Sequence, residues 1–314
     1  MVTCSMDGRT LTVPKGSTIL KAAEQAGIPI PHLCFLKDIN EIGACRMCMV
    51  EVEGTERLVP ACNTAVTEGM VIHTNSPRVR QARKTNLRLI LSQHNSNCTV
   101  CVRSGNCQLQ RLSHDLNIHF QPYEVQLERS HVDLEVPIVR EASKCIKCMR
   151  CIQICDKIQG MHIWDVAGTG SRTTVDVSYN RSLKNTDCTF CGQCVTHCPT
   201  GALTVRDDTN RALRALVDPE ITTVVQVAPA VRVAWAEAFG LPKRQATTGH
   251  MVAALKRIGF DYVFDTNFAA DLTIMEEGSE LLERLSHRGK YRWPMFTSCC
   301  PGWVRFVKTQ LPSY

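Results

Sequence analysis

The 314-residue sequence has no apolar run of about 18 residues, the length that a membrane-spanning helix requires. It also opens without a charged segment followed by an apolar one, the pattern of an export signal, because its first residues "MVTCSMDGRTLTV" alternate like a strand. We therefore expect no membrane span and a cytoplasmic location. In that compartment thiols stay reduced, so clustered cysteines indicate metal sites before they indicate disulfides.

Nucleotide-binding and nucleic-acid-binding motifs are also missing. No G-x-G-x-x-G motif opens a β-α-β unit and no Walker A motif occurs; the short "AGTGS" at residues 167–171 predicts a hairpin turn. Aromatic residues make up 6% of the chain, and the Lys and Arg residues are scattered, without an aromatic-basic platform. The formal net charge is +6. However, about fifteen thiolates on four metal clusters with cores of about +2 each would bring it to roughly −1. We expect no nucleic-acid partner.

What the sequence does contain is 18 cysteines, and the first group lies in residues 1–78. Here we expect strands at 2–5 and 9–13 around the turn "MDGR", then a helix in "GSTILKAAEQAG" that Ser17 caps and Gly27 ends. The group is similar to the plant-type two-iron pattern C-x4-C-x2-C…C, with a first gap of ten residues instead of four. Four thiolates at this spacing also suit zinc. The strand-helix order favours a 2Fe-2S site made by Cys34, Cys45, Cys48 and Cys62.

The second group follows a helix predicted in "SPRVRQARKTNLRLILSQH", with Ser76 as N-cap and Pro77 at its first position. A histidine at a helix end is usually solvated or a cap. Here it starts the pattern H-x3-C-x2-C-x5-C, which favours metal ligation in a small helical domain over residues 79–124. Structural zinc is the alternative to a 4Fe-4S cluster. The ligands in either case are His94, Cys98, Cys101 and Cys107.

The third group is an internal repeat of C-x2-C-x2-C-x3-C within residues 125–212, after a connector at 114–143. The copies are "CIKCMRCIQIC" and "CTFCGQCVTHCP", the second with the proline that typically follows. In two-cluster ferredoxins the fourth cysteine of each run ligates the other cluster. The repeat disfavours zinc or disulfides. It predicts two 4Fe-4S sites, held by Cys145, Cys148, Cys151 and Cys198 and by Cys188, Cys191, Cys194 and Cys155.

Residues 213–314 predict an incomplete α/β domain. The apolar, β-branched run "ITTVVQVAPAVRV" is typical of a strand buried on both faces, and "DYVFDT" and "PMFTS" are further strand candidates. Helices are expected in "TGHMVAALKRIGF", "AADLTIMEEGSELLERLSHRG" and "GWVRFVKTQL". Alternating β and α elements indicate a parallel, doubly wound sheet whose chemistry lies at the carboxyl ends of its strands.

The sequence resembles FeFe (iron-only) hydrogenases along essentially its whole length. The distinctive stretches are "TSCCPGW", "QVAPAVRVA" and "FDTNFAADLTIMEEGSE"; the iron-sulfur part is also similar to the iron-sulfur subunit of NADH dehydrogenase. The resemblance implies an α+β multidomain chain. Its parts are a plant-ferredoxin-like (β-grasp) domain, the small His-ligated 4Fe-4S domain, a bacterial 2x4Fe-4S ferredoxin-like domain and the first part of the catalytic domain.

The resemblance also implies roles for residues of the last domain. Cys300 ligates the H-cluster, a 4Fe-4S cubane bridged to a di-iron centre, while Cys299 passes protons. The split is chemically consistent, because a ligating thiol is deprotonated and an unligated one can carry a proton. Glu277, Glu280 and Arg284 continue the proton path, although helical glutamates are usually solvated. Ala228 and Pro229 contact the cofactor. The alternative for the paired thiols is inert core packing, which we expect for Cys4.

The family binds its catalytic cubane through four cysteines, three of which have no counterpart in these 314 residues. We therefore expect the H-cluster only where other sequence completes the site. The expected function is reversible reduction of protons to hydrogen, as an oxidoreductase of the ferredoxin hydrogenase class. The alternative is a non-catalytic electron-transfer subunit of an NADH-dehydrogenase-like or NAD(P)-reducing complex. Expected partners are ferredoxin or a flavoprotein subunit that binds NAD(P)H, and the hydrogenase maturation proteins.

Overall fold

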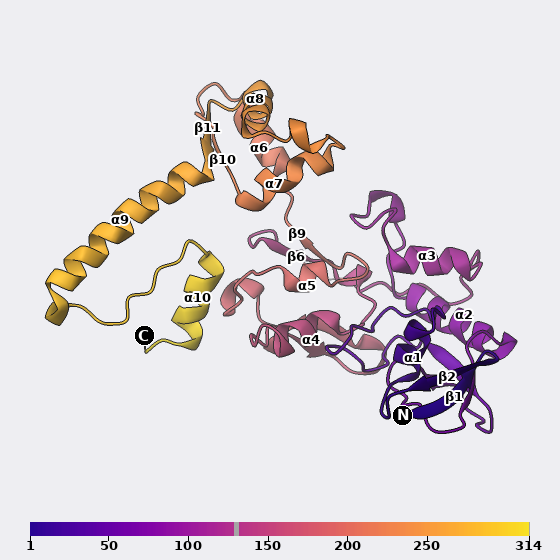
Figure 1. Ribbon diagram of the computed structural model, residues 1–314. Helices are drawn as coiled ribbons and strands as arrows, with labels where there is room; N and C mark the ends of the chain where they lie inside the picture. Colours follow the sequence, from indigo (N-terminus) through magenta and orange to yellow (C-terminus); the bar gives the residue numbers. More distant parts are fainter. Residues whose placement is uncertain (129–131, 314) are drawn as a thin grey trace. The chain divides into compact units, whose positions relative to one another are not determined.

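The computed structural model describes residues 1–128 and 132–313, which form two compact units, Met1–Arg206 and Asp207–Tyr314 (Figure 1). Residues 129–131 of the connector expected at 114–143, and Tyr314, lie outside the described part. The first unit carries all the cysteines of the four predicted iron-sulfur sites. The second carries Cys299 and Cys300.

A five-stranded sheet forms the N-terminal part of the first unit, in the order β2-β1-β5-β3-β4. β1 and β2 make the predicted hairpin, whose turn residues Asp7 and Gly8 both have positive φ, as a tight hairpin turn requires. β5 pairs parallel to β1 and antiparallel to β3. The strands are β1 (Val2–Met6), β2 (Arg9–Val13), β3 (Met49–Val52), β4 (Val59–Pro60) and β5 (Val71–His73).

Helices α1 (Ile19–Gln25) and α2 (Pro77–Leu91) confirm the two helices predicted for this part. The predicted cap of α1 is wrong by one residue. Thr18, not Ser17, has the extended backbone of an N-cap, and its hydroxyl accepts from the Lys21 amide. The cap of α2 is as predicted, with the Ser76 hydroxyl accepting from the Val79 amide at 3.2 Å.

The core of this part lies between the sheet and α1, and its fully buried members include Met6, Ile19 and Ile72. Cys4 belongs to the same core, in β1. Burial raises the pKa of its thiol. A protonated, buried thiol surrounded by apolar side chains acts as a small hydrophobic residue. The structure therefore supports the expectation that Cys4 fills the core.

The rest of the first unit consists of short elements that connect the cysteine loops. β7 and β8 form an antiparallel hairpin whose turn contains "AGTGS", as predicted. A strand not foreseen in the connector, β6, pairs antiparallel with β9. The elements are α3 (Gln108–Asp115), β6 (Ile138–Arg140), α4 (Arg150–Lys157), β7 (Trp164–Ala167), β8 (Thr174–Val177), α5 (Gln193–Thr196) and β9 (Leu203–Val205).

A second hydrophobic cluster joins these segments to the N-terminal sheet. It takes side chains from the loop after α1, from α2, from α3 and from the first ferredoxin-type loop. Three of its members are cysteines predicted to ligate two different clusters. Segments that are distant in sequence therefore share one apolar core. Its buried members are Leu33, Cys34, Cys45, Met47, Leu87, Leu109, Leu112, Ile146 and Cys148.

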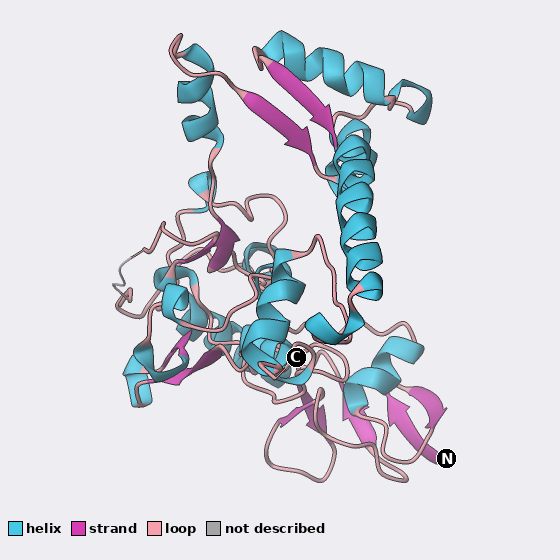
Figure 2. Cartoon of the chain, turned by 90° about the vertical axis from the view of Figure 1, so that its left-hand side faces the viewer, coloured by secondary structure: helices cyan, strands magenta, loops and turns pink. Residues whose placement is uncertain are grey.

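The second unit contains one pair of parallel strands and five α-helices in its described residues. Figure 2 shows the two strands side by side. In their register Val224 lies opposite Tyr262 and Val227 opposite Asp265. Parallel pairing with helices between the strands agrees with the predicted β-α alternation. The elements are α6 (Thr209–Val217), β10 (Val224–Val227), α7 (Pro229–Ala238), α8 (Thr248–Ile258), β11 (Tyr262–Asp265), α9 (Thr266–Ser286) and α10 (Pro301–Gln310).

Two predictions for this unit are wrong. The strand expected through 221–233 ends at Val227, because Pro229 occupies the first position of α7, where its fixed φ suits a helix. Residues 294–298 form no strand, since β10 and β11 pair only with each other among the described residues. The described residues also include no helix that is both long and apolar enough to cross a bilayer.

Candidate iron-sulfur sites

Cys34, Cys45, Cys48 and Cys62 come together in the N-terminal part of the first unit, and all four are buried. Their side chains form two hydrogen-bonded pairs, Cys34 with Cys45 and Cys48 with Cys62. A 2Fe-2S cluster needs two protein ligands on each of its two irons. No group of three or more His, Cys, Asp or Glu side chains in the described residues is arranged to hold a single metal ion. The two thiol pairs match the two protein ligands per iron that a 2Fe-2S cluster needs.

Hydrogen bonds around the Cys45 sulfur stabilise its thiolate form. Hydrogen bonding from Cys34 lowers the pKa of Cys45 to about 5, with help from the backbone amides of Met47 and Leu33. The Leu33 amide lies 3.4 Å from the sulfur. An iron-bound cysteine is a thiolate, and amide donors stabilise that form. This loop therefore favours the ligand form of the thiol.

Sequence reasoning missed Arg83, a buried cation beside this site. It occupies the apolar face of α2 between Val79 and Leu87, one helical turn from each. Its guanidinium donates to the Met49 carbonyl at 2.8 Å. Burial lowers the pKa of Arg83 to about 10, and charge on Cys48 opposes that shift. The sequence does contain a signal for this residue, namely an arginine in the middle of an otherwise apolar helix face. A charge buried on such a face requires a partner, which would have indicated a nearby polar or charged site.

His94 is buried just beyond the end of α2, and its Nδ1 lies 3.1 Å from the Lys144 carbonyl oxygen. A carbonyl only accepts, so Nδ1 carries the proton and Nε2 keeps the lone pair that could bind a metal. Burial lowers the pKa of His94, which keeps the ring neutral. Of its predicted partners, Cys98 and Cys101 lie at a short 3-10 helix (Cys98–Val100), and Cys107 directly precedes α3.

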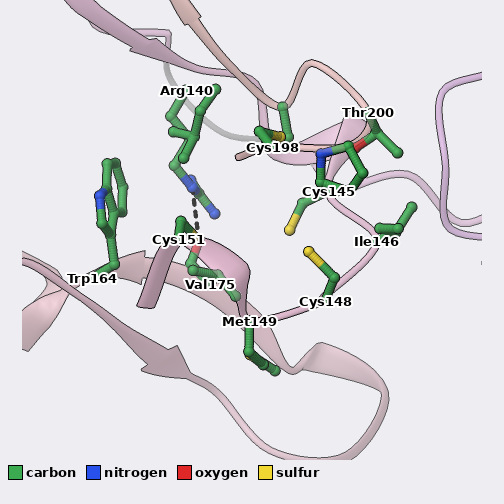
Figure 3. A pocket seen from close by; sticks show the side chains of 13 residues that line it. Arg140, Cys145, Ile146, Cys148, Met149, Cys151, Trp164, Val175, Cys198 and Thr200 are labelled. Carbon is green, nitrogen blue, oxygen red and sulfur yellow. Dashed lines mark hydrogen bonds between the residues drawn. The ribbon is translucent and has the colours of Figure 1, made fainter. Parts of the chain in front are cut away.

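The repeated cysteine runs surround two separate pockets of the first unit. Figure 3 shows the first pocket, where the sulfurs of Cys145 and Cys148 point towards its interior. Each pocket takes three cysteines from one run and the fourth cysteine of the other, which is the arrangement expected of a two-cluster ferredoxin. The first is lined by Cys145, Cys148, Cys151 and Cys198. The second is lined by Cys155, Cys188, Cys191 and Cys194.

The two runs also share backbone geometry. Lys147 and Phe190 occupy the same position in their runs, and both have positive φ. Their amides lie 3.4 Å from the sulfurs of Cys145 and Cys188, respectively. A non-glycine residue in this region is strained, and such strain is typical of functional sites. The strain turns one amide towards the first sulfur of each run, where it can stabilise a cluster-bound thiolate.

Burial makes several thiols of these pockets weaker acids. Burial raises the pKa of Cys148 to about 12 and that of Cys194 to about 12. Burial also raises the pKa of Cys151 well above its ordinary value. A bound metal deprotonates a coordinating thiol outright. Six of the eight cysteines around the two pockets are buried, Cys145 is half-buried and Cys191 is exposed, and metal binding would turn these thiols into ligands.

The second unit brings Glu277, Glu280 and Arg284 of α9 into one cavity of about 500 Å³. Arg284 Nε donates to Glu280 at 2.8 Å. Residues before and within α10 also line this cavity, among them Thr297 and Ser298. The predicted carboxylates therefore lie beside the residues that directly precede the paired cysteines.

The paired cysteines do not line that cavity. Cys299 and Cys300 are exposed, and Cys300 is the N-cap residue of α10, where its amide donates to Ser298 Oγ at 3.0 Å. Ala228 caps α7 and Pro229 opens it, also outside the cavity lining. The structure thus places Glu277, Glu280 and Arg284 in one cavity and leaves Cys299, the other predicted proton carrier, outside its lining together with the predicted cofactor-binding residues.

Comparison with protein-family models divides the chain into four segments. Residues 1–77 match a 2Fe-2S iron-sulfur cluster binding domain, and residues 83–122 match the NADH-ubiquinone oxidoreductase-G iron-sulfur binding region. Residues 136–204 match the ferredoxin-like domain of NADH-quinone oxidoreductase subunit 3. Residues 221–314 match the C-terminal domain of the iron only hydrogenase large subunit. Domains that bind 2Fe-2S and 4Fe-4S clusters are therefore present.

Individual relatives match nearly the whole chain. The NADP-reducing hydrogenase subunit HndD of Solidesulfovibrio fructosivorans is 46% identical across 99% of this chain and 55% of its own length. Iron hydrogenase 1 of Clostridium pasteurianum is 36% identical across 99% of this chain and 54% of its own length. The chain thus spans about half the length of these relatives.

A solved structure is similar to about two thirds of the chain. The crystal structure of an NAD⁺-reducing [NiFe]-hydrogenase in the H₂-reduced state matches with a TM-score of 0.60 and 25% identity. That match covers 65% of this chain and 87% of the other. These comparisons identify the chain as a relative of the iron-only hydrogenases that also carries iron-sulfur domains similar to those of NADH dehydrogenase subunits.

Proposed function

We propose that this chain is the electron-input region and the first part of the catalytic domain of an iron-only hydrogenase, which catalyses 2H⁺ + 2e⁻ ⇌ H₂. The observation that carries the proposal is the hydrogenase-type segment at 221–314, in which "TSCC" directly precedes α10. Paired cysteines in that position have no place in an electron-transfer subunit that lacks a catalytic domain.

Four resident clusters follow from the ligand sets of the first unit. The buried thiol pairs would hold a 2Fe-2S cluster, His94 with three cysteines a 4Fe-4S cluster, and the two ferredoxin-type pockets one 4Fe-4S cluster each. When bound, such clusters supply one-electron transfer, with plant-type two-iron centres near about −400 mV. That potential is close to that of the proton/hydrogen couple at neutral pH, so electron flow in either direction is feasible.

The pocket of Cys145, Cys148, Cys151 and Cys198 is proposed as the point where electrons from the two peripheral sites converge. Its Lys144 carbonyl accepts from His94 and, at 2.7 Å, from the Thr200 hydroxyl. Arg103, between ligands of the His94 site, donates to the Cys198 carbonyl at 2.8 Å. The His94 site therefore contacts this pocket through two separate hydrogen bonds.

In the second unit we propose Cys300 as the H-cluster ligand and Cys299 as the proton carrier, with Glu277, Glu280 and Arg284 continuing the path. The shared cavity of the three α9 residues supports the path. Ala228 and Pro229 would line the cofactor. Three further cysteines would have to come from sequence beyond these 314 residues, and hydrogenase maturation proteins would insert the di-iron centre.

Substitution of the paired cysteines in the full-length, matured protein tests this proposal. Cys299→Ala should abolish hydrogen turnover and leave the active-site cluster assembled, because only a proton carrier is lost. Cys300→Ala should lose the cluster. Infrared bands of iron-bound CO and cyanide report assembly independently of turnover. Equal loss of those bands in both variants would contradict the division of roles.

A non-catalytic electron-transfer subunit remains the second candidate. It is favoured by the likeness to a chain of an NAD⁺-reducing [NiFe]-hydrogenase, because that likeness covers 65% of this chain. Such a subunit would exchange electrons with a flavoprotein that binds NAD(P)H, or with ferredoxin. Hydrogen evolution by the full-length matured protein from reduced viologen would support the hydrogenase. No hydrogen evolution from a protein with all its clusters loaded would support the non-catalytic electron-transfer subunit.

A further inference from the structure

Asn40 is a fully buried polar residue in the loop that carries the first two-iron cysteines. The loop closes on itself at this point. The Leu36 amide donates to the Asn40 carbonyl at 3.0 Å, and the Asn40 amide donates to the Leu36 carbonyl at 2.7 Å. These reciprocal bonds fix the backbone of Asn40. Its side chain therefore leaves the loop in a defined direction.

The side-chain amide of Asn40 joins two cysteines that are far apart in sequence. Nδ2 donates to the Cys34 carbonyl at 2.7 Å and to the Cys148 carbonyl at 2.9 Å. Both acceptors are carbonyl oxygens, which cannot donate, so the amide must present its nitrogen to them. Cys34 belongs to the two-iron set and Cys148 to the first ferredoxin-type pocket. One planar group thus spans the ligand backbones of two predicted clusters.

Asn40 has both an unsatisfied polar atom and two satisfied ones. Its Oδ1 is buried without a hydrogen-bond partner, which costs about 1–3 kcal/mol. An apolar side chain of similar shape avoids that cost but removes the two hydrogen bonds that Nδ2 donates to buried carbonyls. The two donated hydrogen bonds are therefore the feature that distinguishes asparagine here.

Arg150, from the first ferredoxin-type cysteine run, also binds the two-iron loop. It follows the strained residue Met149 at the start of α4 and donates to the Cys34 carbonyl at 3.2 Å and to the Phe35 carbonyl at 2.8 Å. The Cys34 carbonyl therefore accepts from two side chains. Both carbonyls that Arg150 contacts belong to the two-iron loop. Asn40, in contrast, donates to the carbonyl of a predicted ligand from each site, Cys34 and Cys148.

We propose that Asn40 is a positioning residue for electron transfer between the two-iron cluster and the cluster of Cys145, Cys148, Cys151 and Cys198. Its amide holds the two ligand carbonyls at a fixed separation and supplies a hydrogen-bonded path between them. The step moves one electron: the two-iron cluster is oxidised by one electron, the four-iron cluster is reduced by one, and no proton or bond is exchanged. This inference rests on the proposed electron-transfer function.

The test measures the rate at which one electron redistributes between the clusters in the reconstituted 314-residue chain. A flash of deazaflavin photoreduction supplies less than one electron per chain, and rapid-freeze EPR follows the two-iron and four-iron signals. Asn40→Leu should slow redistribution about 10-fold, the lower range for loss of groups that orient cluster ligands. Asn40→Ser, whose short hydroxyl can reach at most one carbonyl, should give an intermediate rate.

The matched control is Asn86→Leu. Asn86 donates its side-chain amide to the Arg46 carbonyl at 2.9 Å, in the same two-iron loop, but its contacts do not reach the ferredoxin-type pocket. This variant should redistribute the electron at the wild-type rate. A purely structural effect on the loop would slow both the Asn40 and Asn86 variants.

The outcomes separate the inference from the function on which it rests. A wild-type rate in Asn40→Leu or Asn40→Ser, with both clusters present by iron analysis and EPR, would overturn the positioning role. Loss of a cluster in both Asn40 variants would also overturn it and assign Asn40 to cluster retention. If the wild-type chain itself bound zinc or no redox-active iron, the proposed function would fail instead.

Discussion

The two units differ in how deeply their cysteines are buried. In the first unit the predicted ligands are buried or half-buried, with the exception of Cys191, and several lie inside hydrophobic clusters. In the second unit Cys299 and Cys300 are both exposed. The difference follows from the packing. The first unit buries a full apolar core, whereas the described residues of the second bury only Val227, Ala236 and Met251 among the apolar side chains.

In this protein the predicted ligand sets and the hydrophobic cores occur together. Where neighbouring loops supply four predicted ligands, apolar side chains pack around them. In the second unit, which supplies one predicted ligand, large side chains stay exposed, for example Phe268 and Trp303. Large exposed apolar side chains are typical of interaction surfaces. The experiments below test this difference between the two units.

The largest expected effect is loss of a whole cluster. Cys148→Ser in the reconstituted chain should remove about four irons, because one missing thiolate opens a four-ligand set. The matched variant Cys300→Ser should leave iron at the wild-type level of about fourteen per chain, the sum of one 2Fe-2S and three 4Fe-4S clusters. Iron analysis and EPR measure both. Iron loss in Cys300→Ser would show that the second unit holds a cluster unaided.

The next effect concerns core packing. Leu87→Ala removes a side chain that is 0% exposed in the cluster shared by α2 and the cysteine loops, and should destabilise the first unit by about 2–5 kcal/mol. Leu282→Ala truncates a side chain of α9 that is 67% exposed, and should change stability by less than about 0.5 kcal/mol. Urea unfolding followed by circular dichroism gives both values. Similar losses would mean that α9 is packed as tightly as α2.

A smaller effect is expected on a reduction potential inside the first unit. His94→Cys should keep four irons at its site but lower the potential, because an anionic thiolate replaces a neutral imidazole. We expect a decrease on the order of 60 mV, which for a one-electron couple corresponds to a tenfold change in the equilibrium constant of reduction. The control His114→Cys alters an exposed histidine of α3. Redox-poised EPR provides the measurement, and zinc at the site would contradict the cluster assignment.

Arg83→Met should lower the two-iron potential in the same direction, since the buried guanidinium favours the more negative, reduced cluster. Arg80→Met, on the exposed face of α2, is the matched control and should leave the potential unchanged. Redox titration of the two-iron EPR signal compares the two variants. An unchanged potential in Arg83→Met would leave Arg83 with a structural role through the Met49 carbonyl alone.

The smallest effect is expected at the ion pair of the second unit. Glu280→Gln removes the charge that Arg284 contacts at 2.8 Å, but both side chains are partly exposed. Such pairs contribute about 0–1 kcal/mol, so thermal unfolding should hardly change. Hydrogen turnover in the full-length protein should nevertheless fall if Glu280 carries protons. Unchanged turnover would remove Glu280 from the proposed path.

The cysteine groups and most local elements could be predicted from the sequence. The predicted hairpin of β1 and β2, the capped helix α2 and the "AGTGS" turn were confirmed because they depend on residues adjacent in the chain. The grouping of the repeated cysteines into two pockets also follows a rule of spacing. Spacing could not predict which segments pack against those groups.

The contacts between the cysteine groups depend on tertiary packing and could not be predicted from the sequence. The strand expected at 294–298 failed because strand formation needs a neighbouring strand, and the described sheet offers none. Arg83, Asn40 and the Lys144 carbonyl acquire their positions through residues at least 34 positions away in the chain. Hydrogen bonds and apolar contacts of such long range depend on how loops close around a shared core. A linear pattern predicts the ligands, and packing determines how one ligand set contacts the next.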